Sequence, residues 1–358
     1  MTRQGICVMD VLTYQCPQCG APLTFHEDTQ RWDCAFCMGS FDVETLKKLE
    51  QEKQKNQDNP EPETPQQDAA SMTEYTCPQC GAHIVTEETT AATFCVFCQN
   101  PTIFPEKLQG AFQPAKVIPF VKTKEDAQKA FQKLCSKKPL LPKDFYAPDR
   151  IEKITGVYVP FWLFDCDSSG AMTASATRVH TWSDRKYRYT KTDYYRIERA
   201  GILNFGKIPA DGSKKMDNAL MDSIEPYDMS KMIDFTPAYL AGFLAERYDE
   251  DHEAVYPRIK TRVEESLENA LRNTIDGYTG VMIQDRHFHI CDQGHRNVLF
   301  PVWMLMSKYK GKDYLFAMNG QTGKIVGDLP ISKGRAAAWF AGITAAASLL
   351  LFLGGLLF

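Results

Sequence analysis

Length, composition and charge describe a largely globular chain with room for two or three domains. The sequence has 358 residues, 44% hydrophobic and 24% charged, which excludes full-length disorder and a polytopic membrane protein. Its 41 basic and 45 acidic residues give a net charge of −4, so the overall charge does not favour nucleic acid as a partner. Any basic patch must therefore be local.

Cysteine usage is the most specific feature, because eight of the twelve cysteines form four Cys-x-x-Cys pairs. The N-terminal residues lack the apolar run of a signal peptide, so we expect synthesis in the reducing cytoplasm, where paired cysteines favour metal over disulfides. The pairs form two Cys-x2-Cys-x14-Cys-x2-Cys sets, the second 61 residues after the first: Cys16, Cys19, Cys34 and Cys37, then Cys77, Cys80, Cys95 and Cys98. This repetition indicates an internal duplication.

Each set predicts a zinc ribbon, which we call ribbon 1 (residues 14–42) and ribbon 2 (residues 75–104). Two tight turns that each present two thiolates complete a tetrahedral, all-sulfur site. Such a site has no open coordination position, so we expect two structural Zn²⁺ ions per chain; rubredoxin-like iron is the chemical alternative. The residues expected to supply the positive φ of the turns are Gly20, Gly81, Gly39 and Asn100.

A polar linker, residues 43–74, separates the two ribbons. Its first part, to Lys55, has a helical composition, whereas its second part, from Asn56, has almost nothing to bury and is expected to be disordered.

Residues 105–335 predict a larger mixed α+β body with an antiparallel sheet. Thr123–Asp126 reads as a helix cap before apolar residues at helical spacing, and the β-branched and aromatic bias from Val157 to Ile197 predicts a β-meander. Helices are expected over 236–247 and 255–275, and strands over 281–291, 298–309, 314–318 and 324–326, with turns at Gly311-Lys312 and Asn319-Gly320. A helix followed by similar strands around Pro160 and Pro301 suggests that the body is internally duplicated.

The C-terminal residues 336–358 contain no charged side chain and predict one transmembrane helix, with a buried globular helix as the alternative. Lys333 and Arg335 precede it, which predicts a single-pass protein of the cell membrane with its N-terminal body cytoplasmic. Ala338, Gly342 and Ala346 form a small-residue stripe that favours helix association, and hence an oligomer, in the lipid bilayer.

The charges of the ribbons favour protein over nucleic acid as the partner. Ribbon 1 has only Arg31 against four acidic residues, and ribbon 2 has Glu87 and Glu88 with no lysine or arginine. Each four-thiolate zinc centre adds further negative charge, which would repel phosphate.

A local basic stretch, residues 178–199, is a candidate surface for an anionic ligand. Five aromatic residues alternate with its basic ones, as in surfaces that stack single-stranded nucleic acid or contact anionic lipid. A solvated hairpin with one face packed inward is the alternative. The basic residues are Arg178, Arg185, Lys186, Arg188, Lys191, Arg196 and Arg199.

Two further observations bear on catalysis. His287, His289 and Cys291 would share one face of a strand, with His295 nearby, so a metal site there competes with histidines that simply face water. The sequence contains none of the common hydrolase, phosphate-binding, metalloprotease or dinucleotide motifs, and we therefore predict that the protein is not an enzyme.

The sequence resembles the YdjG-type proteins of Gram-positive bacteria, a family of TFIIB-type zinc ribbon-containing membrane proteins. The matching stretches include Cys16–Leu23, Gly156–Asp165, Met216–Tyr227, Phe300–Trp303 and Phe316–Gly323. The resemblance implies zinc ribbons ahead of a cytoplasmic domain and C-terminal membrane segments, with a link to membrane-associated complexes in envelope stress, and implies no known activity. This chain differs in having two ribbons and room for one span.

These observations together predict a membrane-anchored scaffold that binds other proteins, themselves membrane-associated. The alternative is a membrane-tethered nucleic-acid binder that uses residues 178–199. A third hypothesis, an enzyme with a site around His287 and His289, requires a third metal ion.

Overall fold

A computed structural model gives the architecture of the chain. It describes residues 14–21, 23–26, 31–42, 45–46, 48, 73–77, 83–95, 101–146 and 153–355. Most of the predicted linker lies outside these residues. The described chain is mixed α+β, with antiparallel and mixed sheets, which confirms the predicted character of the body. It divides into two compact units, the first made of 1–160, 215–247 and 299–358 and the second of 161–214 and 248–298.

Ribbon 1 belongs to the first unit and forms a three-stranded antiparallel sheet. The strands are β1 (Thr24–His26), β2 (Arg31–Asp33) and β3 (Ser40–Phe41), in that order. Trp32 pairs with Phe25 on one side and Phe41 on the other, and is buried. Phe25, Trp32 and Phe41, one on each strand, give this small module a core that it shares with the rest of its unit.

Ribbon 2 is divided between two sheets. Strands β4 (Thr73–Thr76) and β5 (His83–Thr86) pair only with each other, whereas β6 (Thr90–Phe94) pairs with β7 (Pro101–Ile103) and with β12 (Leu244–Glu246). The contact with β12 places Ala92 opposite Ala245, and both are buried. The second half of ribbon 2 is therefore part of the largest sheet of the protein.

The rest of the first unit is built around an aromatic core. Phe120 and Phe243 stack with their ring centroids 4.1 Å apart, and the Trp303 indole N–H donates to the Lys122 carbonyl at 2.9 Å. The surrounding strands are β8 (Lys116–Val117), β11 (Ile233–Asp234), β14 (Lys312–Asn319) and β15 (Ile325–Gly327). The helices are α2 (Lys124–Ser136), α4 (Asn218–Ser223), α6 (Lys333–Gly355) and short 3-10 turns at Pro105–Leu108, Gly110–Phe112, Lys143–Tyr146, Met229–Lys231 and Pro237–Leu240.

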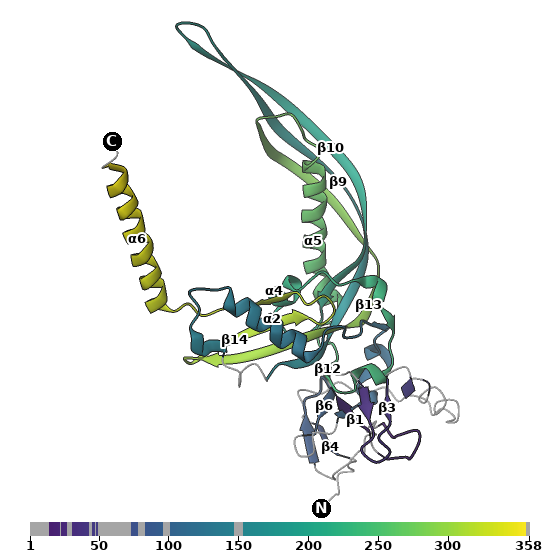
Figure 1. Cartoon of the computed structure of the whole chain (residues 1–358). Coiled ribbons are helices and arrows are strands. Elements are labelled where there is room, and N and C mark those ends of the chain that lie inside the picture. The colour runs from purple at the N-terminus through teal and green to yellow at the C-terminus, as the bar shows by residue number, and fades with distance from the viewer. Residues whose placement is uncertain are drawn as a thin grey trace, which may run out of the picture. The chain divides into compact units, whose positions relative to one another are not determined.

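The second unit contains one helix, the strand β10 and the larger parts of two long strands, β9 and β13, that continue into the first unit (Figure 1). Strands β9 (Thr155–Ser183) and β10 (Arg188–Asp211) form an antiparallel hairpin whose register runs from Asp211↔Phe161 to Arg188↔Ser183. Strand β13 (Gly280–Tyr309) pairs with the other edge of β9, and α5 (His252–Arg272) lies along the hairpin. The buried residues of α5 are four residues apart, as an amphipathic helix requires: Val255, Ile259, Val263, Leu267 and Leu271.

Several local predictions are confirmed. Helix α2 begins at a capping box formed by Thr123 and Asp126 and buries Ala127, Phe131 and Cys135. A turn joins β13 to β14 as expected, but Lys310 and Gly311, both with positive φ, form it, one residue before the predicted Gly311-Lys312. These features depend on short-range spacing, which the sequence displays directly.

Other local predictions are wrong. Residues 236–247 form a 3-10 turn and β12 instead of a helix, because Gly242 at φ 83° interrupts the helical path. The expected β-meander is one long hairpin, and the two strands expected over 281–309 are the single strand β13. Strand pairing thus extends much further than the sequence pattern indicated.

The predicted transmembrane helix over 336–358 requires correction. Among the described residues, no helix is both long and apolar enough to cross a membrane. Single-pass membrane localisation with a cytoplasmic body is therefore not supported. Ala338, Gly342 and Ala346, the predicted helix-packing residues, lie on α6 and are exposed.

Candidate metal centre

Ribbon 1 brings its four cysteine sulfurs together. The Sγ atoms of Cys16, Cys19, Cys34 and Cys37 all lie within 4.8 Å of one another. Cys16 Sγ is 3.4 Å from Cys37 Sγ, and Cys19 Sγ is 3.4 Å from Cys34 Sγ. A tetrahedral Zn²⁺ with bonds of about 2.3 Å separates its sulfur ligands by about 3.8 Å. The cluster therefore fits a zinc ion, and it is the one such group found within the described residues.

Two equivalent turns present these sulfurs. The Gly20 amide donates to the Cys16 carbonyl at 2.8 Å, and the Met38 amide donates to the Cys34 carbonyl at 2.9 Å. Gly20 has φ 74°, as predicted, but in the second turn the left-handed residue is Met38, at φ 59°, rather than Gly39. A Cβ at Gly39 would lie 2.9 Å from the Phe41 ring, so close packing explains that glycine. Gly81 and Asn100 lie outside the described residues.

The pKa values of the thiols in this cluster are not shifted in the same direction: that of Cys34 is lowered, whereas those of Cys19 and Cys37 are raised, with side-chain hydrogen bonds between the thiols contributing to both increases. Hydrogen bonding from the backbone amide of Cys37 is the main cause that lowers the pKa of Cys34 to about 6. Of these thiols, Cys34 is the one whose surroundings favour the thiolate form that binds metal.

The cluster is continuous with the core of its unit. Tyr14 packs against Trp32 with ring centroids 5.1 Å apart, and Phe25 joins Trp32 to Phe243 at 5.4 and 5.6 Å. A Cβ at Gly242 would lie 1.7 Å from the Phe25 ring, so the ring lies directly on this glycine. The ribbon is fixed to the body by aromatic packing, and its four ligands leave no position open for substrate.

The structure describes two of the four cysteines of ribbon 2. Cys77 and Cys95 are fully buried and contact each other in a small cluster, whereas Cys80 and Cys98 lie outside the described residues.

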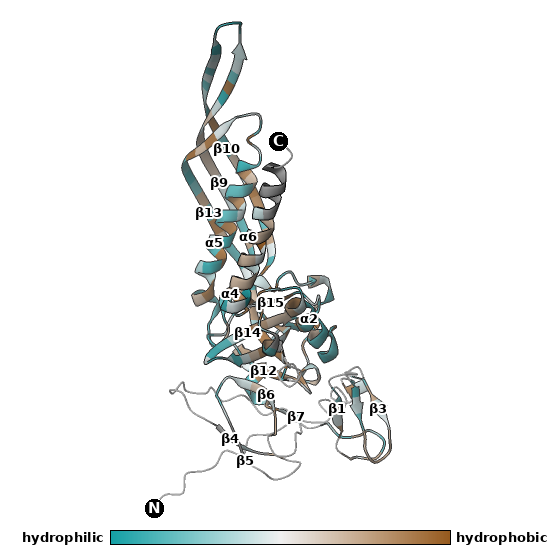
Figure 2. Ribbon diagram, turned by 60° about the vertical axis from the view of Figure 1, so that its left-hand side comes forward, coloured by the Kyte–Doolittle hydropathy of each residue, from teal (hydrophilic) through white to brown (hydrophobic). Residues whose placement is uncertain are grey.

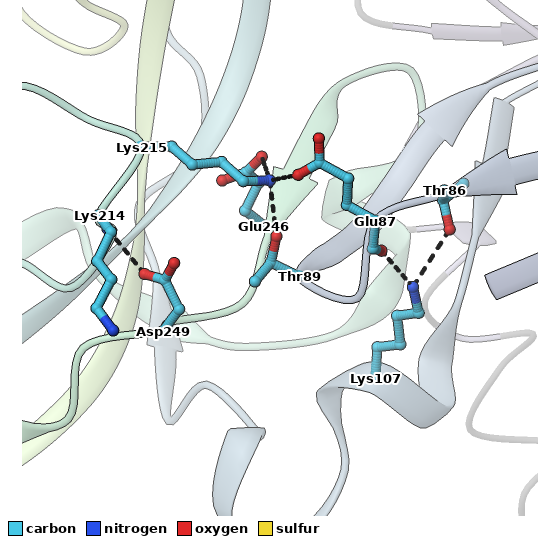
Figure 3. Close-up of polar contacts among 8 residues, drawn as sticks. All are labelled: Thr86, Glu87, Thr89, Lys107, Lys214, Lys215, Glu246 and Asp249. Carbon is cyan, nitrogen blue, oxygen red and sulfur yellow. Dashed lines mark hydrogen bonds and ion pairs between the residues drawn. The ribbon is translucent and has the colours of Figure 1, made fainter. Parts of the chain in front are cut away.

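The acidic turn of ribbon 2 is neutralised by residues distant in sequence. Lys215 forms ion pairs with Glu87 and, at 2.9 Å, with Glu246, and its ammonium donates to Thr89 at 2.7 Å (Figure 3). Arg247 pairs with Glu88 in the same way. The expectation that ribbon 2 repels phosphate through Glu87 and Glu88 therefore loses much of its basis.

A buried lysine supports the same turn. The Lys107 ammonium donates to the Glu87 carbonyl at 2.7 Å and to Thr86 Oγ1 at 3.3 Å (Figure 3). It also lies over the Tyr75 and Phe104 rings. Burial lowers the pKa of Lys107 to about 8. No pattern in the sequence distinguished Lys107 or Lys215, because their partners are far away along the chain.

The basic stretch of residues 178–199 separates into two groups in the second unit. Arg178 donates to the Gly277 carbonyl at 3.0 Å and Arg199 to Thr274 Oγ1 at 3.0 Å, so both hold the end of α5 to the hairpin. Lys191 pairs with Asp193 at 2.9 Å, and Arg196 with Glu198 at 3.2 Å. Arg185, Lys186 and Arg188 are exposed at the end of the hairpin. Within the predicted surface, these three residues are the ones for which the structure shows neither an ion pair nor a side-chain hydrogen bond among the described residues.

The histidines of β13 do not form a metal site within the described residues. His289 Nε2 is 3.1 Å from Cys291 Sγ, whereas His287 contacts Asp285 and His295 contacts Asp292, each at 3.1 Å. His287 and His289 border an open pocket of about 890 Å³. The His252 ring, which the sequence did not single out, stacks on His295 with centroids 3.7 Å apart.

The fold and site together define a mixed α+β protein with a four-cysteine cluster compatible with a zinc ribbon. No family model matches the chain, and no solved structure is significantly similar to it. The chain is 40% identical over 347 residues to the uncharacterised protein YdjG of Bacillus subtilis (strain 168), covering 97% of this chain and 98% of that protein. The chain belongs to the family of YdjG.

Proposed function

We propose that this protein is a protein-binding adaptor whose ribbons are shaped by structural Zn²⁺. The carrying observation is the cluster of Cys16, Cys19, Cys34 and Cys37, in which four sulfurs enclose one ion position beside the hydrophobic core. Such a zinc ion replaces core that a short module cannot build, and it has no free coordination position for catalysis. Binding is therefore the activity that the site supports best.

A second Zn²⁺ in ribbon 2, held by Cys77, Cys80, Cys95 and Cys98, is part of this proposal. Its support is the identical spacing of the two cysteine sets and the joint burial of Cys77 and Cys95. Two thiols buried in contact, without a disulfide, are the arrangement that one half of a zinc site provides.

In-cell crosslinking of the tagged full-length chain tests the adaptor function. We expect specific proteins to copurify after nuclease treatment, and the Cys34→Ser variant to lose those that contact ribbon 1. Recovery of nucleic acid, with protein capture abolished by nuclease, would contradict the proposal. So would an absence of crosslinked protein.

The alternative function, nucleic-acid binding, has fewer basic residues available to it than the sequence suggested. It now depends on Arg185, Lys186 and Arg188, since the other basic residues of 178–199 hold the fold together or pair with acidic neighbours. Salt-dependent binding of single-stranded RNA, lost in Arg188→Glu, is its requirement.

A further inference from the structure

The end of the β9–β10 hairpin is not covered by any part of the chain that the structure describes. Every residue from Val179 to Lys191, which we call the hairpin tip, is exposed. Figure 2 shows hydrophilic residues at this tip, in contrast to the hydrophobic parts of β9 beside α5. An extension without a core of its own contributes little to stability, so its side chains are available for another role.

Three large aromatic side chains lie on the tip. Trp182 and Tyr189 face each other across the ladder and stack with centroids 5.6 Å apart and planes at 15°, and Tyr187 lies beside Tyr189. They are 53%, 41% and 64% exposed. Aromatic residues held by a strand ladder lose little conformational entropy on binding, and such residues anchor protein interfaces.

The turn of the tip carries excess positive charge. Asp184 accepts hydrogen bonds from the Lys186 and Tyr187 amides at 2.8 and 2.7 Å and from the Tyr189 hydroxyl at 3.0 Å. Its carboxylate is therefore used to close the turn. Arg185, Lys186 and Arg188 have no ion pair among the described residues, and their charges point into solvent.

We infer that the hairpin tip is a docking site for an acidic segment of a partner protein, with Trp182, Tyr187 and Tyr189 as its apolar anchor. The inference rests on the adaptor function and names the surface that performs it. Charge complementarity favours an acidic partner. The turn has three basic side chains and one carboxylate, that of Asp184, which is hydrogen-bonded within the turn.

The small extent of the positive surface favours a peptide over a nucleic acid as the ligand of the hairpin tip. Single-strand binders line a groove with cations so that several successive phosphates are neutralised. Here Lys191 and Arg196, further along β10, are paired with Asp193 and Glu198, so the free charge ends within a few residues of the turn. A short acidic segment with an apolar side chain matches this compact patch.

Fluorescence anisotropy with the zinc-loaded full-length chain tests the inference. The probe is a fluorescein-labelled peptide of Asp and Glu with one central Phe, and the same peptide with Lys in place of the acids is the probe control. Arg188→Glu is expected to raise the Kd about tenfold, equivalent to about 1.4 kcal/mol. Trp182→Ala is expected to weaken binding while leaving its salt dependence unchanged.

Arg196→Glu is the matched control, because it makes the same charge change on the same strand at an exposed residue outside the tip. We expect it to change the Kd by less than about twofold. Equal peptide binding by wild type and Arg188→Glu would overturn the inference, as would tighter binding of oligouridylate that the same tip variants abolish. If the tip variants bind the peptide as wild type does and the wild-type chain still crosslinks to proteins in cells, the docking site is wrong and the adaptor function stands. If the wild-type chain crosslinks to no protein, the docking site and the adaptor function are both wrong.

Discussion

The two ribbons have the same cysteine spacing but different surroundings. Ribbon 1 keeps three strands of its own and meets the body through side chains, with Phe25 lying on Gly242. Ribbon 2 meets the body through its backbone, because β6 pairs with β12, and through ion pairs of Lys215 and Arg247. One duplicated metal motif is thus attached to one protein in two physically different ways.

This difference separates what a metal site determines from what its surroundings determine. The cysteine spacing fixes a local turn and a ligand set, and these repeat in the sequence. Strand partners are chosen by hydrophobic and polar residues elsewhere in the chain, which did not repeat. We therefore expect damage to ribbon 1 to remain local and damage to ribbon 2 to spread into the large sheet.

The largest expected effect is the loss of the ribbon 1 metal. Cys34→Ser should remove about one zinc per chain and unfold ribbon 1, because structural zinc contributes an apparent 10–16 kcal/mol, roughly, in small modules. Zinc analysis measures the first change, and the loss of tryptophan fluorescence contributed by Trp32, one of five tryptophans, measures the second. Cys135→Ser is the control, since Cys135 is equally buried but is not near the cluster. Unchanged zinc in Cys34→Ser would show that Cys34 is not a ligand.

The Ala245→Asp variant tests the attachment of ribbon 2 to the body through the pairing of β6 with β12. This change places an unpaired carboxylate opposite Ala92 in the sheet, at a fully buried position, and should cost several kcal/mol, about 3–5. Ala254→Asp makes the same substitution at an exposed position in the first turn of α5, where an acid is tolerated. Urea unfolding compares the two. Equal midpoints would mean that β6 and β12 do not pair.

The Gly242→Ala variant tests the attachment of ribbon 1 to the body through the packing of Phe25 on Gly242. The new methyl group would overlap Phe25 at a position that already has φ 83°, so we expect a loss of about 2–4 kcal/mol in unfolding free energy. Gly110→Ala has similar backbone strain, at φ 58°, with nothing within 4 Å, and should cost only about 1 kcal/mol. If both variants lose the same amount, Phe25 does not pack on Gly242.

The smallest effect concerns the pH dependence of ribbon 2. Burial lowers the pKa of Lys107 to about 8, from an ordinary value of 10.5. Between these values the unfolded chain binds more protons, so this lysine makes the unfolding free energy increase with pH over that window. NMR of ¹³C-methylated lysines should show Lys107 titrating near pH 8, with exposed Lys129 as the reference. A midpoint near 10.5 would show that Lys107 is not buried.

Short-range patterns predicted short-range structure well. The capping box of α2 and the apolar face of α5 follow from residues three or four positions apart, and the cysteine cluster of ribbon 1 forms within one segment, Cys16–Cys37. The turn between β13 and β14 was also predicted, one residue away from its position at Lys310-Gly311. In each of these, the interaction that fixes the structure lies inside the segment that displays the pattern.

Long-range structure was missed for the complementary reason. Ala92 and Ala245 pair although nothing near either residue specifies the other, and the partners of Glu87 and Glu88 come from beyond residue 214. The predicted membrane span was an inference from apolar length alone, and it failed on that same criterion within the described residues. The hairpin tip was visible as composition, but only the structure showed which of its cations are free.

Zinc stoichiometry combined with X-ray absorption at the zinc edge tests the central claim most directly. The account predicts two zinc ions per full-length chain, each bound by four sulfurs, with one ion lost in Cys34→Ser and the other in Cys77→Ser. A single zinc per chain, or nitrogen and oxygen in the zinc coordination shell, would contradict it.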